Sequence, residues 1–571
     1  MNCFASRTLL IVAGSLLSVA GFSQKKEVPK GWHLMDLKDS GYYGISMDKA
    51  YDFVQSKKLK STPVIVAVLD SGVDTAHEDL KPILWRNPGE IPGNGIDDDK
   101  NGYVDDVYGW NFLGSRDGVN VEKDSYEAAR VYHQLKSKWE DKTVDPKTLS
   151  AADAKEYDMW TRAKKDVVGV SASAADLAQM KSGYAQLTFV DSVVHVGDSI
   201  IRKDLKKEEY TCKDLANYTP TADIAGRVKM LMTSICKDNN KDDITNTDIL
   251  EDLEAEVGQL ESEIAKNEAV STAPKDFRNS VVKDNYSDIN DKFYGNNNVM
   301  VSNKSALHGT HVSGIIGAVR DNNIGIKGVA DNVRIMTVRV VPDGDEHDKD
   351  IALGIRYAVD NGAKVINMSF GKGFSPEKKW IDEAVQYAQS KGVLLVHAAG
   401  NSAQNVDTSW NFPSSVTLTG TKAPNWITVG ASGDPKAGGL VASFSNYGKK
   451  EVDVFAPGVQ IYATVPGGNT YQNLQGTSMA SPVVAGLAAF IMEYYPKLSA
   501  EQVKYVIEKS AQKPTSGKVI EPGTGEEVKM SDISSSGGVI NAYEAIKLAS
   551  TLKPEGKNEK QASKVNQKVK G

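Results

Sequence analysis

Strand-like and helix-like segments alternate through the second half of this chain, and this alternation restricts the possible folds more than any other feature. Residues 333–341, 363–370 and 392–400 are apolar runs that predict buried strands. Residues 349–362 and 377–392, which separate them, carry apolar side chains at helical spacing. Strands that alternate with helices indicate βαβ units and a parallel sheet covered on both faces. We therefore predict an α/β fold, in which ligands bind beyond the carboxyl ends of the strands.

The first part of the chain predicts one more buried strand and then a change of character. Residues 64–70 form an apolar run that ends in an Asp-Ser-Gly turn. Between residues 113 and 300 glycine becomes sparser and charged residues and alanine rise. One segment there has an apolar stripe at helical spacing, typical of a packing face: Leu250, Leu253, Val257, Leu260 and Ile264. We predict a mostly helical inserted domain over 113–300, which divides the α/β domain into 24–112 and 301–550.

The two ends of the chain differ from the rest. Arg7, the apolar run 8–22 and the small residue Ser23 predict a cleaved export signal over 1–23. A retained N-terminal anchor is the alternative. The run is short for a membrane span and no other stretch is long enough, so we expect no integral span in the mature chain. We expect the protein to be exported, to the periplasm or outside the cell. Residues 551–571 are polar and lysine-rich and predict a disordered basic tail.

Three polar residues at predicted strand ends or helix starts have the side chains that nucleophilic catalysis requires. Asp70 ends the first strand, His308 opens a glycine-assisted helix start, and Ser478 opens an apolar helix. A serine hydroxyl is a poor nucleophile until a base takes its proton, and a histidine base needs a carboxylate to hold its tautomer. Singly, each residue has a structural interpretation as a turn residue, a buried histidine or a helix cap. Together they indicate a Ser-His-Asp site.

Six motifs around these residues resemble those of the subtilisin-like serine proteases, or subtilases. They are VAVLDSGVD (66–74), HGTHVSGIIGA (308–318), NMSFG (367–371), AAGN (398–401), APG (456–458) and GTSMASP (476–482). The chain order Asp, His, Ser is also that of subtilisin. The resemblance covers roughly 24–112 and 301–550. It implies a subtilisin-like three-layer fold with a mostly parallel sheet, to which the helical inserted domain is added.

The resemblance also implies a role for each site residue. Asp70 is expected to orient His308, the general base, and Ser478 to be the nucleophile of a serine endopeptidase that works through an acyl-enzyme. The side-chain amide of Asn401 is expected to join the backbone N–H of Ser478 in an oxyanion hole. No cofactor is expected for the chemistry.

The resemblance further implies an edge strand that pairs with an extended protein or peptide substrate. The residues of that edge are Ser369, Phe370 and Gly371. A monomer is the family expectation, although Asp70 and His308 are 238 positions apart, far more than in a minimal subtilase. Few residues precede the first catalytic strand, so we expect folding without a cleaved N-terminal chaperone domain.

An acidic loop between the first strand and the insertion predicts a structural Ca²⁺ site. Five ligands match positions of a calcium-binding loop: Asp97, Asp99, Asn101, the Tyr103 carbonyl and Asp105. The final bidentate glutamate of such loops is missing, because Tyr108 stands there. A solvated acidic turn is the alternative.

Charge and cysteine content narrow the remaining possibilities. The net charge of −7 leaves no basic footprint for nucleic acid. Cys212 and Cys236 form either a disulfide, as suits an exported protein, or two free thiols. Two other functions remain open, a binding module with vestigial catalysis and an ester-specific acyl hydrolase.

Overall fold

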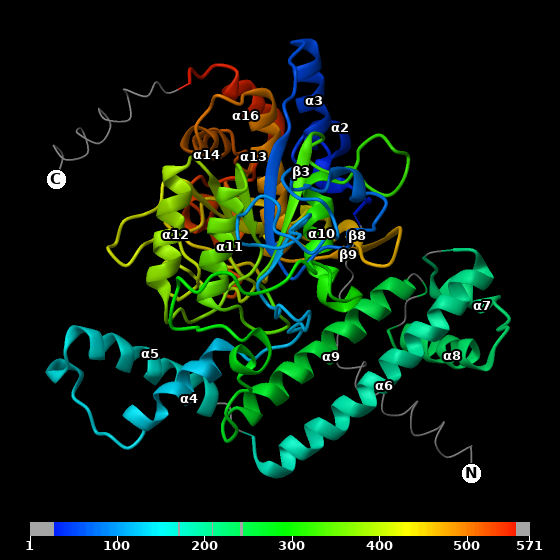
Figure 1. Cartoon of the computed structure of the whole chain (residues 1–571). Helices are drawn as coiled ribbons and strands as arrows, with labels where there is room; N and C mark the ends of the chain where they lie inside the picture. The colour runs from blue at the N-terminus through cyan, green and yellow to red at the C-terminus, as the bar shows by residue number, and fades with distance from the viewer. Residues whose placement is uncertain (1–27, 170–171, 208, 240–241, 243, 555–571) are drawn as a thin grey trace, which may run out of the picture. The chain divides into compact units, whose positions relative to one another are not determined.

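The computed structural model describes residues 28–169, 172–207, 209–239, 242 and 244–554 (Figure 1). These residues form two compact units. The helical unit is Ala128–Pro274, and the sheet unit consists of the described residues on either side of it. The predicted signal at 1–23 and most of the predicted tail, 555–571, lie outside the described residues. Within the described residues, every helix is too short or too polar to cross a membrane.

A seven-stranded sheet in the order β2-β3-β1-β4-β5-β6-β7 forms the centre of the sheet unit. Every neighbouring pair in it is parallel. Its strands are β1 (Val64–Asp70), β2 (Gly109–Asn111), β3 (Val333–Arg339), β4 (Val365–Met368), β5 (Leu394–Ala398), β6 (Trp426–Ser432) and β7 (Val454–Pro457). Two antiparallel hairpins are separate from it: β8 (Ile461–Val465) with β9 (Thr470–Leu474), and β10 (Lys518–Ile520) with β11 (Glu527–Lys529).

Both faces of this sheet are buried, and β1 shows why its sequence is almost continuously apolar. Val66 and Val68 belong to one hydrophobic core, whereas Ala67 and Leu69 belong to another. Successive side chains of a strand point to opposite faces, so the two cores lie on the two sides of the sheet. A strand buried on both faces needs apolar residues at every position.

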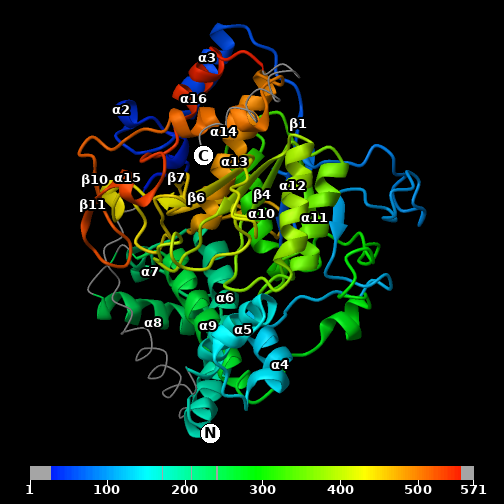
Figure 2. The same cartoon turned by 90° about the vertical axis from the view of Figure 1, so that its left-hand side faces the viewer.

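Helices cover the two faces of the sheet (Figures 1 and 2). One core contains residues of α10 (Asn303–Gly317) and α13 (Thr477–Tyr494). The other contains residues of α11 (Asp348–Asp360) and α12 (Lys378–Ser390). The prediction of a three-layer α/β fold with a mostly parallel sheet is confirmed. The remaining α-helices of the unit are α2 (Leu37–Ser40), α3 (Met47–Ser56), α14 (Ala500–Lys509), α15 (Met530–Ile533) and α16 (Ala542–Ala549).

The helical unit has a hydrophobic core of its own. Its helices are α4 (Glu127–Trp139), α5 (Ala151–Val168), α6 (Ala174–Leu205), α7 (Cys212–Ala216), α8 (Asp223–Asp238) and α9 (Asn246–Glu268). Leu250 and Leu253 of the predicted stripe are buried with residues of α6 and α8, so the stripe is a packing face. Cys212 and Cys236 form a disulfide inside this unit, with their Cα atoms 6.4 Å apart.

The helical unit is narrower than the predicted insertion at 113–300. Leu113, Val121 and Tyr294 are buried in the same core as α11 and α12, and therefore belong to the sheet unit. Asn111 and Asn296 also pair as an isolated antiparallel bridge. The change in composition follows the helices of the helical unit. The segments that flank this unit pack on the sheet unit through contacts distant in sequence, and such contacts leave no pattern in the local sequence.

The start of α10 also differs from the prediction, because the helix begins at Asn303 and His308 lies in its second turn. Ser302 caps the helix, since its Oγ accepts a hydrogen bond from the backbone N–H of Ser305 at 3.2 Å. Ser305 completes this capping box in place of the usual Glu or Gln, so the sequence signal for the helix start is weak.

Candidate active site

The carboxyl edge of the sheet brings together residues from three separate motifs. Asp70 is the last residue of β1, Ser369 follows β4, and Asn401 comes three residues after β5. Because β1, β4 and β5 are adjacent and parallel, their carboxyl ends meet at one edge. Ser478 is the second residue of α13, a helix that contacts all three strands.

A short hydrogen bond joins Asp70 to His308. The distance between Oδ1 of Asp70 and Nδ1 of His308 is 2.7 Å. The Asp70 side chain is 2% exposed, and its Oδ1 also accepts from the backbone N–H of Ser71 at 2.7 Å. A carboxylate can only accept here, so Nδ1 carries the proton and the lone pair of neutral His308 is on Nε2. This is the tautomer of a general base that serves a serine.

The two histidines of α10 have opposite electrostatic environments. Burial acts to lower the pKa of His308, but the charge and hydrogen bond of Asp70 outweigh it, so this pKa is raised above 6.5. Burial lowers the pKa of His311 to about 3, which keeps its ring neutral. The Nε2 of His311 lies 3.1 Å from the carbonyl oxygen of Gln472. His311 is therefore a buried, neutral histidine held through Nε2, whereas the His308 side chain is 35% exposed.

Ser478 lies in the first turn of α13, where backbone N–H groups have no partner within the helix. Its Oγ donates to the carbonyl oxygen of Ser369 at 3.1 Å. The Oγ of Ser369 donates in return to the carbonyl oxygen of Ser478 at 2.9 Å. These reciprocal bonds fix the serine next to the residues that follow β4.

Asn401 is oriented by Thr477. Its Oδ1 accepts from both the backbone N–H and the Oγ1 of Thr477, each at 2.9 Å, so Nδ2 faces away from Thr477. A Cβ added to Gly476 would lie 3.3 Å from Nδ2 of Asn401 and 3.6 Å from the backbone nitrogen of Ser478. Two hydrogen-bond donors thus border one small space that the glycine leaves open. An oxyanion hole requires this arrangement.

The residues after β4 present an alternating backbone. The carbonyl of Phe370 faces inward, because it lies 2.8 Å from Nε2 of His397. Backbone groups of an extended strand alternate, so Ser369 and Gly371 face the opposite side, and Ser369 contacts Ser478 there. No other described residue hydrogen-bonds to the backbone N–H or C=O of Gly371. The predicted edge therefore has backbone groups available to an extended chain.

Comparison with known proteins identifies the family of the chain. A model of the subtilase family matches residues 61–528. The chain belongs to the subtilase family. Subtilases are serine endopeptidases whose chemistry needs no cofactor.

Several relatives of this subtilase share about 40% of the aligned residues. Subtilisin DY of Bacillus licheniformis is 43% identical over 199 residues, which are 34% of this chain and 67% of that protein. The thermophilic serine proteinase of Bacillus sp. (strain AK1) is 40% identical, over 42% of this chain and 52% of that protein. Among solved structures, a protease from Pseudoalteromonas arctica PAMC 21717 has 30% identity and a TM-score of 0.35, over 42% of this chain and 70% of that one. The chain spans about half to two thirds of these curated relatives.

A hollow of about 290 Å³ in this subtilase adjoins Ser478 and Asn401. Its lining includes Phe370, Gly371, Trp410 and Asn411. Trp410 is 57% exposed and stacks on Phe412, with ring centroids 5.8 Å apart. The sequence motifs give no indication of Trp410 or Asn411. The motif GTSMASP contains Thr477, but its sequence does not show that this residue orients Asn401.

The acidic loop of the subtilase is arranged differently from the predicted ligand set. Asp97 accepts from the backbone N–H groups of Asn101 and Gly102, and Asp105 accepts from those of Gly93 and Gly95. Among the described residues, the carboxylates that converge within 4.8 Å are those of Glu90, Asp99 and Asp106. Only Asp99 is common to the two sets.

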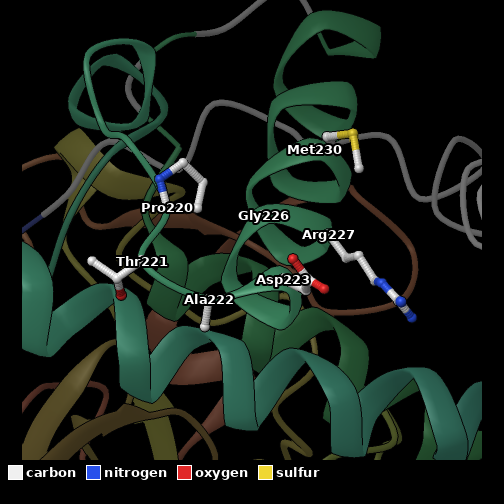
Figure 3. Close-up of a pocket in the computed structure, with 7 residues that line it drawn as sticks. All are labelled: Pro220, Thr221, Ala222, Asp223, Gly226, Arg227 and Met230. Atoms are coloured by element: carbon white, nitrogen blue, oxygen red, sulfur yellow. The ribbon is translucent and has the colours of Figure 1, made fainter.

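The helical unit of the subtilase has a separate open hollow of about 490 Å³ beside α8 (Figure 3). The lining residues are Pro220, Thr221, Ala222, Asp223, Gly226, Arg227 and Met230. They include no histidine and no serine, so this hollow lacks the serine nucleophile and the histidine base of a Ser-His-Asp site.

Proposed function

We propose that this subtilase is an exported endopeptidase that cleaves peptide bonds with Ser478 as nucleophile, His308 as general base and Asp70 as the residue that orients it. The 2.7 Å hydrogen bond between Asp70 and His308 carries the proposal, because it joins two motifs 238 positions apart in the tautomer that a base requires.

The proposed reaction assigns a step to each of these side chains. It requires Oγ of Ser478 to exchange its hydrogen bond to Ser369 for one to Nε2 of His308. As Oγ attacks the peptide carbonyl carbon, Nε2 takes its proton and Asp70 stabilises the imidazolium. The carbonyl oxygen becomes negative and is held by Nδ2 of Asn401 and the backbone N–H of Ser478.

The proton that His308 has taken then moves to the leaving group, and water completes the reaction. The imidazolium gives its proton to the leaving amine nitrogen, the C–N bond breaks, and an ester to Ser478 remains. His308 then takes a proton from water, whose oxygen attacks the ester. The Oγ–C bond breaks and Ser478 recovers its proton from Nε2.

Substrates of this enzyme are extended protein segments. The backbone of Gly371 offers both a donor and an acceptor, so a substrate strand binds by main-chain pairing. Folded segments have already used these backbone groups, which favours unfolded or loop regions as substrates. The adjoining hollow receives one side chain of the substrate.

Export and a structural Ca²⁺ complete the proposal. The predicted signal at 1–23 supports export, as does similarity to a cell wall-associated protease of Bacillus subtilis, 38% identical over 226 residues. The convergence of Glu90, Asp99 and Asp106 supports a cation that offsets their mutual repulsion, since carboxylate oxygens are ligands that Ca²⁺ prefers. We expect a monomer.

The decisive experiment compares the purified mature protein with its Ser478→Ala variant on an unfolded protein substrate. We expect hydrolysis by the first and none by the second. A sulfonyl fluoride that labels Ser478 without any protein hydrolysis would contradict endopeptidase activity while leaving an assembled triad. Equal hydrolysis by both proteins would exclude Ser478 as the nucleophile.

A further inference from the structure

Lys372, the residue that follows the substrate edge, is a fully buried cation. Its side chain is 0% exposed. Its Nζ donates to Oε2 of Glu127 at 2.8 Å and to the carbonyl oxygen of Glu346 at 2.6 Å. It also forms an ion pair with Asp348, at 2.8 Å from Oδ1. The reaction described above makes no use of this group.

The backbone of Lys372 is part of the wall of the hollow beside Ser478. Its N–H donates to the carbonyl oxygen of Phe412 at 2.9 Å, and its C=O accepts from the N–H of Phe412 at 2.8 Å. This bridge ties the residues after β4 to the segment that carries Trp410 and Asn411. The position of Lys372 therefore determines the position of Gly371, whose backbone pairs with substrate.

The first turn of α11 anchors Lys372 and the loop that follows it. Besides its ion pair with Lys372, Asp348 accepts through Oδ2 from Oγ of Ser375 at 3.1 Å and from the N–H of Glu377 at 2.8 Å. The loop from Gly371 to Glu377 is thus held at several points by one carboxylate.

The same helical turn is linked to both places where the chain passes between the two units, through Lys372 at the first and directly at the second. Glu127, the partner of Lys372, is the last residue of the sheet unit before the helical unit begins. Arg278 lies just after the return at Lys275 and pairs with Asp350 at 2.8 Å. Next to it, Lys349 pairs with Asp284 at 2.7 Å.

Buried ion pairs of this kind are weak evidence for stability, because desolvation of the charges offsets much of their attraction. Apolar side chains of similar size would fill the same space. An ion pair does, however, specify one geometry, since Nζ must meet Glu127 and Asp348 at the same time. This requirement suits a group whose task is to fix a position.

Resting on the proposed endopeptidase function, we propose that Lys372 is a positioning residue for substrate binding. It holds the Ser369–Gly371 edge in the geometry that pairs with an extended peptide. Through Glu127, the first residue of α4, this geometry depends on the segment that enters the helical unit.

The test uses Glu127→Gln, which removes one charge from Lys372 and leaves its ion pair with Asp348. In the active protein we expect KM for an extended peptide to rise about tenfold while kcat changes less than twofold. Turnover of p-nitrophenyl acetate, which is too small to pair with the edge, should stay within twofold of the parent. Lys372→Met should have the larger effect, but it leaves two carboxylates buried, so Glu127→Gln remains the decisive variant if Lys372→Met fails to fold.

A matched control is Lys504→Met, which removes the cation of the part-buried Lys504–Asp453 pair on α14. It should leave KM for the peptide unchanged. A change in KM below twofold for Glu127→Gln, or an equal loss of peptide and ester turnover, would overturn the inference.

A binding measurement separates this inference from the proposed function. In the Ser478→Ala background, we expect Glu127→Gln to raise the Kd of a fluorescent extended peptide about tenfold. This readout does not depend on hydrolysis. Absence of peptide binding to Ser478→Ala, or an unchanged Kd on adding Glu127→Gln, would overturn the role of Lys372 even if hydrolysis is observed.

Discussion

At the scale of single residues, the electrostatics of His308 depend on Asp70. Burial favours the neutral imidazole, and the nearby carboxylate more than compensates, so the pKa of His308 is raised above 6.5. A general base must be neutral to accept the serine proton. The enzyme is therefore expected to work at a pH above this raised pKa.

Replacing Asp70 should change both the rate and its pH dependence. Asp70→Asn removes the carboxylate charge that favours the imidazolium, so the effect of burial dominates and the pKa of His308 should fall below 6.5. The acid limb of kcat/KM should move from above pH 6.5 to below it, while kcat falls by roughly 10⁴-fold. Rates of ester hydrolysis from pH 5 to 9 provide the measurement. An acid limb at the same pH in both proteins would mean that another group controls it.

The same interaction predicts how stability varies with pH. A raised folded-state pKa contributes stability that is complete below the unfolded value of 6.5 and is lost as pH rises through the folded value. The melting temperature of Ser478→Ala, which cannot digest itself, should therefore decline over a window above pH 6.5. Adding Asp70→Asn should abolish that decline. A decline of equal size in both variants would assign it to other groups.

At the scale of elements, the hydrogen bond between Asp70 and His308 depends on the close approach of α10 to the turn after β1. A Cβ added to Gly309 would collide with the carbonyl oxygen of Gly72 and would lie 3.2 Å from Cβ of Asp70. The missing side chain lets His308, one residue earlier, reach Asp70. Gly309 of the HGTH motif is thus required because α10 packs closely against the turn after β1.

Gly309→Ala should separate those elements. We expect activity to fall at least tenfold and stability to fall by about 1–3 kcal/mol, the usual cost of overpacking. Chemical denaturation and ester turnover provide the measurements. The control is Gly258→Ala in α9, where an added Cβ meets no atom within 4 Å, and this change should leave both values unaffected or slightly improved. Full activity in Gly309→Ala would show that the backbone adjusts freely.

Chelation tests the acidic loop as an element. If Ca²⁺ bridges Glu90, Asp99 and Asp106, removing it with EDTA restores their repulsion and should lower the melting temperature by several degrees. Asp99→Asn should lower the melting temperature and make it insensitive to EDTA. A melting temperature that EDTA leaves unchanged in the parent protein would exclude a structural cation and leave a solvated acidic turn.

At the scale of the whole molecule, the sequence predicts features that arise from local patterns. The apolar run of β1 and the helical spacing around α11 indicate an α/β fold with a parallel sheet covered on both faces, because these patterns lie in neighbouring residues. The three-layer subtilisin-like fold is what the resemblance adds. The limits of the helical unit leave no such trace, since Leu113 and Tyr294 join the sheet unit through distant contacts. The direction of the Asp105 carboxylate likewise depends on turn geometry. The sequence gives no indication that Lys372 is buried, because a buried lysine is recognised only from the ion pairs that it forms in the structure.

The presence of two compact units, each with its own core, predicts two unfolding transitions. The Cys212–Cys236 disulfide closes a loop with a sequence separation of 24 residues in the helical unit. Cross-linking a loop of this size stabilises by about 3 kcal/mol, so reduction should lower the transition of the helical unit by roughly 10 °C. The transition of the sheet unit should not move.

Calorimetry of the Ser478→Ala protein with and without dithiothreitol provides the measurement, and the double variant Cys212→Ser, Cys236→Ser should behave like the reduced protein. A single transition, or equal shifts in both, would show that the two units unfold together and that the catalytic unit depends on the insertion for its stability.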